Sequence, residues 1–398
     1  MRTSLHVCMC AAIASALLLN ACSTDSSQPL FNQSADGKTA TVQAAPPGFA
    51  KVPDHYVVVL SEMDPNTVAG EVERIRMAHG FAVTAVYTTA IQGFSAFIPP
   101  GKLKKLSEEL TVQRIEEDFE VSVSPISDKA KPGGTGPAPS GQNLPWGVAA
   151  VGGPFNGAGK VAWIIDTGID PNHRDLTIDA ARGANFVTGG KLPSPAWKDG
   201  NGHGTHVAGT IAAINNNVDV VGVAAGATVV PVRVLDNRGS GQYAWIIAGV
   251  DYVASRANPG DVANMSLGGP ANSALNTAVY NAATTYLVKF ALAAGNEAKD
   301  CSSTSPASVN GYGIYTVSAH DVNDVFASFS NYGPPVDICA PGVSVLSTKS
   351  GGGTTTFSGT SMASPHVAGL LLVGNVGSRG PVTGDKDSWT DGLAVRVP

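Results

Sequence analysis

Charge is scarce in this 398-residue sequence: charged residues make up 14% of it, and lysine and arginine gather into no basic stripe. With a formal net charge of −6, the composition gives no sign of nucleic-acid binding. Low charge together with 43% apolar residues also excludes an intrinsically disordered chain. We therefore expect a folded protein with a large buried core and no nucleic-acid partner.

Cysteine is almost as scarce, and most of it lies near the N-terminus. Of the five cysteines, Cys8, Cys10 and Cys22 precede residue 23, which leaves Cys301 and Cys339 for the rest of the chain. Two cysteines in an oxidising compartment can form a disulfide, whereas two separate buried thiols need no partner. The sequence leaves both alternatives open.

Long apolar runs are missing as well. Residues 11–19 are too short for a permanent transmembrane helix, and with Arg2 before them they are typical of an export signal, over residues 1–22. The signal ends in LNAC (residues 19–22), which resembles a bacterial lipoprotein signal with Cys22 as the site of a lipid anchor. An ordinary secretory signal is the alternative. Both interpretations predict a protein outside the cytoplasm, either secreted or held in the cell envelope as an outer-membrane lipoprotein.

The next part of the chain divides by composition. Residues 23–51 are polar and contain Pro-Pro-Gly, which predicts a flexible spacer. The periodicity of residues 52–125 predicts the order β-α-β-β-α-β, a small ferredoxin-like α+β domain. Residues 126–141, rich in Lys, Pro and Gly, are typical of an exposed linker that a protease would cut. In the α+β domain we expect strands at 56–60, 82–87, 94–98 and 115–123, a helix through 68–79, and a second helix marked by Leu103, Leu106 and Leu110.

Residues 142–398 alternate apolar runs with stretches of small residues. Residues 160–166 (KVAWIID) are almost continuously apolar, as in a strand that is buried on both faces of a parallel sheet. This alternation predicts an α/β domain with a central, mainly parallel sheet. Further strands are expected at 229–235, 262–265, 287–293 and 314–318, and helices at 207–214, 245–257 and 274–285.

Three motifs in this region supply an aspartate, a histidine and a serine. Asp166 ends the first strand in DTGID, His203 lies in GHGTHVAG, and Ser361 lies in SGTSMASPH. A serine hydroxyl is a poor nucleophile alone, but a histidine can accept its proton and later return it to a leaving amine. A buried aspartate can hold that histidine in the right tautomer. These residue types therefore favour acyl transfer with Asp166, His203 and Ser361 as the catalytic residues.

The order Asp, His, Ser and the three local sequences resemble the subtilisin-like serine proteases, and the spacing within the motifs is similar to proteinase K-like members. The resemblance implies a subtilisin-like three-layer fold and a serine endopeptidase that works through an acyl-enzyme. It also implies that Asn296, in the segment AAGN, donates to the oxyanion together with the backbone N–H of Ser361.

The same resemblance implies where protein and peptide substrates bind. Two segments match the family's pocket-wall strand and the edge that pairs with an extended peptide: Ser266, Leu267, Gly268 and Gly269 in the first, and Gly239, Ser240 and Gly241 in the second. Backbone pairing reads the main chain more than particular side chains. We therefore expect broad specificity, with a mild preference for apolar or aromatic residues before the cut bond.

A structural Ca²⁺ site is implied as well, because family members often build one from oxygen ligands at matching places. Asp219 departs from the glycine expected in that loop, and a polar surface loop without metal is the alternative. The matching residues are Gln142, Asp175, Ile214, Asn216, Val218 and Val220.

By pattern and position, residues 52–125 resemble the family's inhibitory propeptide, which would assist folding of the parallel sheet and hold its own tail in the active site. The chain is then a monomeric, self-processing zymogen, with residues 142–398 as the peptidase domain. Two other functions stay open: a catalytically silent, protease-like binding protein, and a maturation protease with few partners. Residues 374–398 are short and rich in Gly and Asp where the family has an amphipathic helix, which predicts a compact or less stable C-terminal end.

Overall fold

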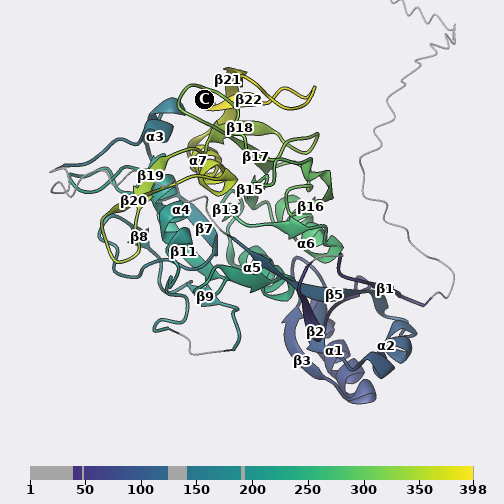
Figure 1. Cartoon of the computed structure of the whole chain (residues 1–398). Coiled ribbons are helices and arrows are strands. Elements are labelled where there is room, and N and C mark those ends of the chain that lie inside the picture. Colours follow the sequence, from purple (N-terminus) through teal and green to yellow (C-terminus); the bar gives the residue numbers. More distant parts are fainter. Residues whose placement is uncertain (1–38, 47–48, 124–140, 190–192, 398) are drawn as a thin grey trace, which may run out of the picture. The chain divides into compact units, whose positions relative to one another are not determined.

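A computed structural model describes residues 39–46, 49–123, 141–189 and 193–397 (Figure 1). The expected export signal with Cys22, the first part of the expected spacer, and the expected linker except Gly141 lie outside these residues. Across the described ranges, no helix combines the length and the apolar character needed to cross a membrane. We call residues 39–123 the N-terminal domain and residues 141–397 the C-terminal domain.

The N-terminal domain is a sheet with the strand order β1-β5-β2-β4-β3 and two helices. The expected order β-α-β-β-α-β is confirmed by β2 to β5 with α1 and α2. Apolar residues of both helices, such as Ile75 and Leu106, pack on the sheet residues Val58, Phe94 and Ile115. The elements are β1 (Thr41–Gln43), β2 (Lys51–Leu60), α1 (Pro65–His79), β3 (Ala82–Tyr87), β4 (Gly93–Phe97), α2 (Pro100–Ser107) and β5 (Val112–Ser122).

Local sequence explains where α1 begins and ends. The Asp64 side chain accepts a hydrogen bond from the first turn, and Pro65 occupies the first helical position, where its missing N–H costs nothing. Gly80 ends the helix with a φ of 63°, a left-handed conformation that glycine adopts without strain. Between these caps, Val72 and Ile75 lie on the buried face.

The second helix is shorter than expected. Leu106 is buried in α2, but the helix ends at Ser107 and Leu110 is 93% exposed. After Ser107 the chain tightens, because the N–H groups of Glu108 and Glu109 donate to carbonyls three residues back. That turn directs the chain into β5, so the helical spacing of Leu110 was misleading.

The expected spacer also needs correction, because its described part is structured. β1 pairs in parallel with β5, with Val42 opposite Ile115, and β2 already begins at Lys51. Beyond β1, the N–H of Ala45 donates to a carboxylate oxygen of Glu117 at 2.8 Å. A three-residue strand carries too little periodicity to be recognised, and only the free edge of β5 gives it partners.

The C-terminal domain contains a sheet with the order β21-β22-β18-β17-β15-β13-β7-β11-β8. Each pair from β22 to β8 is parallel, and β21 runs antiparallel to β22, so the expected central, mainly parallel sheet is confirmed. The strands are β7 (Val161–Asp166), β8 (Thr177–Ile178), β11 (Thr228–Arg233), β13 (Val262–Met265), β15 (Lys289–Ala293), β17 (Ile314–His320), β18 (Ile338–Pro341), β21 (Asn375–Pro381) and β22 (Gly392–Val397).

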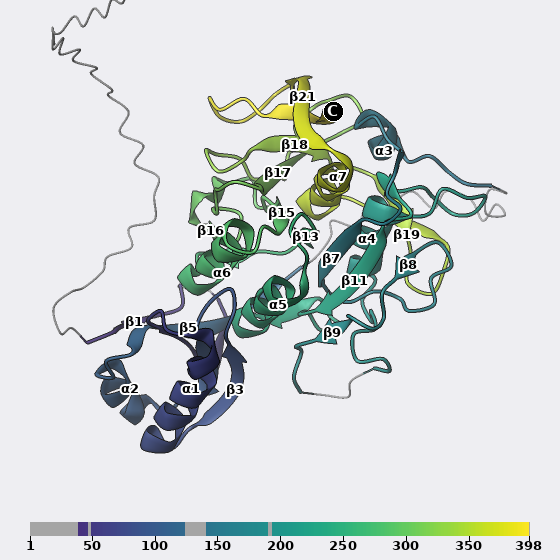
Figure 2. The ribbon, with the colours of Figure 1, turned by 180° about the vertical axis from the view of Figure 1, so that it is seen from behind.

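Helices cover both faces of this sheet (Figure 2). Trp163 and Ile165 of β7 pack in one core with α5 and α6, whereas Ala162 and Ile164 pack in another with α4 and α7. Alternate residues of a strand point to opposite faces, which is why the strand is apolar throughout. The fold is therefore a three-layer α/β arrangement. Its helices are α3 (Trp146–Ala150), α4 (His203–Ala212), α5 (Tyr243–Arg256), α6 (Ser273–Thr284) and α7 (Thr360–Val373).

Short elements fill the connections between these layers. The strand expected at 287–293 begins only at Lys289, because Leu287 has a φ of 58°, outside the extended region. The short elements are β6 (Phe155–Asn156), β9 (Ala184–Asn185), β10 (Ala224–Ala225), β12 (Ser240–Gln242), β14 (Gly269–Pro270), η1 (Cys301–Ser303), β16 (Thr304–Ser305), β19 (Val345–Thr348) and β20 (Thr354–Phe357).

The C-terminal end forms a β-hairpin of β21 and β22, and β22 joins the main sheet beside β18. Cys339 lies on β18, and both it and Cys301 are buried and free, which favours the interpretation as two separate thiols. Burial raises the pKa of the Cys301 thiol to about 12, with a smaller contribution from the charge of Asp300. Both thiols are therefore held in the unreactive protonated form.

The residue before β22 gives this end of the fold a pH dependence. Burial raises the pKa of Asp391 to about 7 against the opposing hydrogen bond from Ser318, and the charges of Asp385 and Asp387 raise it further. An ordinary aspartate has a pKa of about 4. Because the folded state favours the protonated form, the stability that Asp391 contributes is present below about pH 4 and is lost as the pH rises through about 7.

We expect Asp391→Asn to remove this dependence. Both proteins carry Ser361→Ala, which prevents self-cleavage. The Tm of the Asp391→Asn variant minus that of the parent should rise by a few degrees as the pH is raised from about 4 to about 8. Thermal melts over this pH range measure it. A Tm difference that stays constant with pH would contradict the assignment.

Candidate active site

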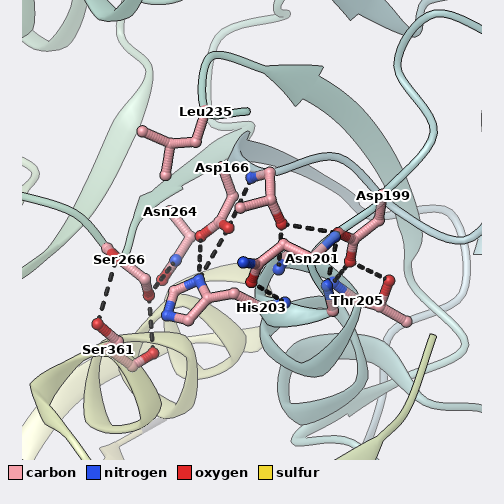
Figure 3. Close-up of polar contacts among 12 residues, drawn as sticks. Asp166, Asp199, Asn201, His203, Thr205, Leu235, Asn264, Ser266 and Ser361 are labelled. Carbon is pink, nitrogen blue, oxygen red and sulfur yellow. Dashed lines mark hydrogen bonds and ion pairs between the residues drawn. The ribbon is translucent and has the colours of Figure 1, made fainter. Parts of the chain in front are cut away.

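Asp166 and His203 meet at the carboxyl end of the parallel sheet. Asp166 is the last residue of β7, His203 is the first residue of α4, and both side chains are buried. His203 Nδ1 lies 2.8 Å from Asp166 Oδ1 and 2.9 Å from Oδ2, and the N–H of Thr167 also donates to Oδ1 (Figure 3). The carboxylate thus accepts from Nδ1–H and orients the imidazole, with Nε2 left as the second ring nitrogen.

Ser361 lies at the start of α7, at the same edge of the sheet (Figure 3). Its Oγ donates to the carbonyl oxygen of Ser266 at 3.2 Å, while Ser266 Oγ donates to the carbonyl oxygen of Ser361 at 2.8 Å. Among the described residues, His203 Nε2 is buried and has no hydrogen-bond partner. A hydrogen bond from Ser361 to His203 therefore requires the serine hydroxyl to turn away from Ser266, a change that substrate binding can bring about.

Asn296 presents an amide N–H beside the start of α7. Its Oδ1 accepts hydrogen bonds from Thr360 N–H at 2.8 Å and from Thr360 Oγ1 at 3.0 Å, so the Nδ2 end remains as the donor. A Cβ atom placed on Gly359 would lie 3.6 Å from Asn296 Nδ2 and 3.7 Å from the backbone N of Ser361. Because Gly359 has no Cβ, the space between Asn296 and the start of α7 stays open; Asn296 Oδ1, also 3.7 Å from that point, is already engaged by Thr360.

One of the two expected peptide-binding segments is already paired with the chain itself. β12 pairs antiparallel with the end of β5, with Gly241 opposite Val121 and Ser240 one position further along. The pairing continues past the strand, because the N–H of Val123 donates to the carbonyl oxygen of Gly239 at 2.9 Å. The structure thus places the tail of the N-terminal domain, residues 120–123, along this edge.

The second expected segment lies against the same tail. A Cβ atom on Gly269 would come within 2.6 Å of Val121 Cγ1, so only glycine leaves room for that side chain. Within this segment Ser266 contacts Ser361, Leu267 is buried in the core and Gly268 is exposed. Of the residues expected to bind a peptide, Gly239, Ser240, Gly241 and Gly269 therefore lie against an extended stretch of the chain's own backbone.

Buried carboxylates connect the two domains away from this edge. Asp118 accepts a hydrogen bond of 3.2 Å from a backbone N–H in the first turn of α5, and Glu116 accepts one of 3.3 Å from the first turn of α6. In the opposite direction, Asp251 of α5 accepts from the backbone N–H groups of residues 88–90 at 2.7–3.1 Å. Carboxylates at helix N-termini are stabilised by the free N–H groups and the helix dipole.

Comparison with known proteins agrees with this geometry. The family model described as "Subtilase family" matches residues 157–373, more than half of the chain, and includes Asp166, His203, Asn296 and Ser361.

The chain belongs to the subtilase family.

Its curated relatives are longer than the matched part of the chain. Alkaline serine exoprotease A of Vibrio alginolyticus is 37% identical over 366 residues, which cover 86% of this chain and 64% of the relative. Subtilisin E of Bacillus subtilis is 44% identical over 240 residues, which cover 58% of this chain and 61% of that relative. The matched region thus spans 61–64% of the length of these relatives.

Two solved structures of subtilases share the fold. A cold-adapted subtilisin-like serine proteinase matches with a TM-score of 0.56 and 35% identity, covering 65% of this chain and 100% of that structure. Fervidolysin from Fervidobacterium pennivorans, a keratinolytic enzyme related to subtilisin, matches with a TM-score of 0.66 and 25% identity, covering 85% of this chain and 56% of that structure. These matches support the subtilisin-like α/β fold.

The residues that the subtilase resemblance assigns to Ca²⁺ lie together. Gln142 Nε2 donates to the carbonyl oxygens of Ile214 at 2.6 Å and Val220 at 3.0 Å, and it lies 3.4 Å from Asn216 Oδ1. Asp175 accepts from Asn216 Nδ2 at 2.7 Å. Burial raises the pKa of Asp175, against the opposing hydrogen bonds from Val220 and Asn216. The oxygens of Ile214, Asn216 and Val220 surround the amide nitrogen of Gln142, with Asp175 beside Asn216, and carbonyl, amide and carboxylate oxygens are ligands that suit Ca²⁺.

Two neighbours refine this assignment. The N–H of Val218 donates to Asn216 Oδ1 at 2.7 Å, so this residue also belongs to the loop. Asp219 has a φ of 49°, the conformation for which glycine is usual, and its carboxylate lies 3.0 Å from Arg174. The departure from glycine is thus accommodated, with an arginine balancing the added charge. Across the described ranges, this loop included, no three or more His, Cys, Asp and Glu side chains are grouped to hold a metal, so the proposed ligands are mainly carbonyl and amide oxygens.

Sequence analysis missed two polar residues that organise the site. Asn264 donates to Ser266 Oγ at 2.9 Å and accepts from Ser364 Oγ at 2.8 Å, which joins β13 to α7. Asp199 accepts several hydrogen bonds around the start of α4. The segment Asp-Gly-Asn-Gly before His203 carries the signal of a helix cap, but only the structure places Asp199 beside Asp166.

The orientation of Asn296 leads to a prediction on peptide hydrolysis. Asn296→Ala should lower kcat by about 10²–10³-fold with little change in KM, an effect known from subtilisin itself, because the lost donor acts mainly on the oxyanion. Steady-state kinetics on a chromogenic peptide measure it, with Asn310→Ala, at an exposed position, as the control. A variant that raised only KM would instead assign Asn296 to substrate binding.

Proposed function

We propose that the chain is a serine endopeptidase that hydrolyses peptide bonds through an acyl-enzyme, with Asp166, His203 and Ser361 as its catalytic triad. The observation that carries this proposal is the buried Asp166–His203 pair, whose free Nε2 lies at the sheet edge where α7 presents Ser361. The names of the relatives, which include serine proteases and subtilisins, support it. The following steps use only groups of this chain and a bound peptide.

In the first step, Ser361 Oγ attacks the carbonyl carbon of the peptide while His203 Nε2 takes its proton. The carbonyl electron pair moves to the oxygen, which accepts hydrogen bonds from Asn296 Nδ2 and the N–H of Ser361. His203 then protonates the leaving amine as the C–N bond breaks. Water repeats the sequence on the acyl-enzyme and frees Ser361.

The environment of His203 is suited to this proton transfer. Burial alone would lower the pKa of His203, but the charge of Asp166, its hydrogen bond to Nδ1 and the charge of Asp199 outweigh it and leave the pKa raised. A raised pKa makes the imidazole a stronger base toward Ser361. Asp166 also stabilises the imidazolium that forms in each proton transfer.

We further propose that the chain is a zymogen whose N-terminal domain inhibits the peptidase. Residues 120–123 occupy the β12 edge and the space beside Gly269, where an extended substrate would bind. Glu116 and Asp118 on β5 and Asp251 on α5 add hydrogen bonds across the domain boundary. Cleavage within the linker, residues 126–141, would separate inhibitor from enzyme, after which the tail can leave the edge.

Export and a structural Ca²⁺ ion complete the proposal. An N-terminal signal over residues 1–22, with Cys22 as a lipid-anchor site, would take the chain out of the cytoplasm. Gln142, Asp175, Asn216 and the carbonyls of Ile214, Val218 and Val220 would hold the ion. Its role would be to tie the residues after the linker to the loop that follows α4.

Maturation tests the central proposal. Expressed without residues 1–22, the chain should lose the mass of its N-terminal domain over time and then degrade casein, whereas Ser361→Ala should stay intact and inactive. Intact mass spectrometry and a casein assay measure the two outcomes. Ser328→Ala, at an exposed position outside the triad, is the control and should still mature.

Two results would redirect the interpretation. A chain that stays whole in both forms and cuts no casein would indicate a catalytically silent binding protein. A chain that cuts its own linker but not casein would indicate a maturation protease with few partners.

Metal removal tests the calcium proposal. Adding EDTA to the mature enzyme should lower its Tm by about 5–10 °C, since a bound ion at about 100 times its Kd contributes about 2.7 kcal/mol. Asp175→Asn should show a smaller EDTA effect, whereas Asp179→Asn, at a surface carboxylate paired with Arg182, should show the full one. Equal EDTA effects in both variants would place the ion elsewhere.

A further inference from the structure

Asp199 is a buried carboxylate beside the triad that the steps above leave without a role. It is 2% exposed, and it lies in the turn that leads to His203 (Figure 3). Five donors converge on its two oxygens, far more than a simple helix cap requires. Oδ1 accepts from Thr167 Oγ1 (2.9 Å), Asn201 N (2.9 Å) and Gly202 N (2.7 Å), and Oδ2 accepts from Thr205 N (3.0 Å) and Thr205 Oγ1 (2.5 Å).

These donors come from both sides of the Asp166–His203 pair. Thr167 directly follows Asp166, and its Oγ1 also accepts from the N–H of Gly204 at 2.9 Å. The other donors belong to the turn before His203 and to the first turn of α4. Asp199 therefore ties the end of β7 to the beginning of α4, the two elements that present the two side chains.

Close packing makes this connection sensitive to small movements. A Cβ atom on Gly204 would come within 2.2 Å of the carbonyl oxygen of Gly168, so α4 approaches the loop after β7 as closely as the backbone allows. Gly202 has a φ of 108°, which only glycine adopts easily, and its N–H points at Asp199. The carboxylate thus adds to the Asp166–His203 pair and to the hydrogen bonds of Thr167 and Thr205 that hold this tightly packed turn against the loop after β7.

Asp199 also brings a second negative charge toward His203. The titratable groups around the imidazole are Asp166, Asp199 and the buried His206, while Arg233, which lies opposite Asp166 in the β7–β11 register, interacts with the charge of Asp199. Burial is the main reason why the pKa of His206 is lowered to about 3, so this neighbour stays neutral and leaves the two carboxylates to act on His203. A negative charge near His203 favours its protonated form.

We propose that Asp199 is a positioning residue for the catalytic pair: it holds His203 in register with Asp166 through Thr167 and the start of α4, and its charge stabilises the imidazolium. The proposal rests on the proposed function for its kinetic consequences, but not for its structural ones. A cap that only stabilised α4 would affect the stability of the protein and leave the protonation of His203 unchanged.

The kinetic test uses Asp199→Asn in the mature enzyme, since asparagine keeps the shape and removes the charge. We expect kcat to fall about tenfold or more with KM changed less than about twofold, because a misplaced base affects the transition state more than binding. The acid limb of the pH profile of kcat/KM should move to lower pH by several tenths of a unit. Asp261→Asn, at the opposite edge of the sheet, is the control for losing a hydrogen-bonded carboxylate, since Asp261 accepts from Trp163 and Asn258.

A second variant pair separates the hydroxyl contact from the charge. Thr167→Val removes, at nearly the same volume, the donor to Asp199 and the acceptor of the Gly204 N–H, and Thr167→Ser keeps both. We expect Thr167→Val to lower kcat about threefold or more and Thr167→Ser to retain most of the kcat of the parent. Equal losses in the two variants would show that packing of the threonine methyl, and not the hydrogen bond to Asp199, matters.

The decisive measurement needs no activity. In the full chain carrying Ser361→Ala, NMR titration of His203 should give a lower pKa when Asp199→Asn is added and an unchanged one with Asp261→Asn. This result would support the positioning role even if the parent chain cut no substrate. An unchanged His203 titration and an unchanged pH profile, together with a Tm loss equal to that of the control, would reduce Asp199 to a helix cap and overturn the proposal.

Discussion

The hydrogen bond between Asp166 and His203 depends on a constraint of parallel sheets, in which strands end and the following helices begin at one edge. β7 ends at Asp166 and α4 begins at His203, 37 residues later, yet the two side chains lie 2.8 Å apart. Both side chains are buried, and a buried polar or charged group without a partner costs free energy. Each side chain is therefore stabilised by its hydrogen bond to the other. The residues of α4, many of them small, are all buried and shield this pair from solvent.

At the same edge of the sheet, β5 of the N-terminal domain lies along β12 of the C-terminal domain. β5 pairs with β1 along residues 114–116 and with β12 along residues 120–122, so it is shared by the two domains. A strand that adds to an exposed edge is held by its main chain, and Gly269 leaves room beside it for the side chain of Val121. Asp118 and Glu116, which accept hydrogen bonds at the starts of α5 and α6, add contacts between the two domains away from residues 120–123.

Departures from expectation have physical causes that single residues illustrate. Leu110 followed the helical period but lies in a turn, because the last residues of α2 tighten before β5. Thr41–Gln43 looked like part of a spacer, because a strand this short is stable only against a partner edge. Near the C-terminus, residues 375–381 and 392–397 form a hairpin beside β18, a structure that the sequence analysis did not specify when it noted that this Gly- and Asp-rich end differs from the family's amphipathic helix.

The sequence by itself determined the family, the three motifs and the layered α/β architecture, because apolar periodicity and short motifs are local properties that the order of residues contains. The resemblance also singled out Asn296, which the structure places beside Thr360 at the start of α7. It further singled out the oxygen-bearing residues that the structure places around Gln142. Only the tertiary structure decided that Asp199 touches the neighbours of both Asp166 and His203, that β5 lies along β12, and that Cys301 and Cys339 are separate thiols. These relations join residues distant in the chain, and nothing in the local sequence of either partner specifies the distance between them.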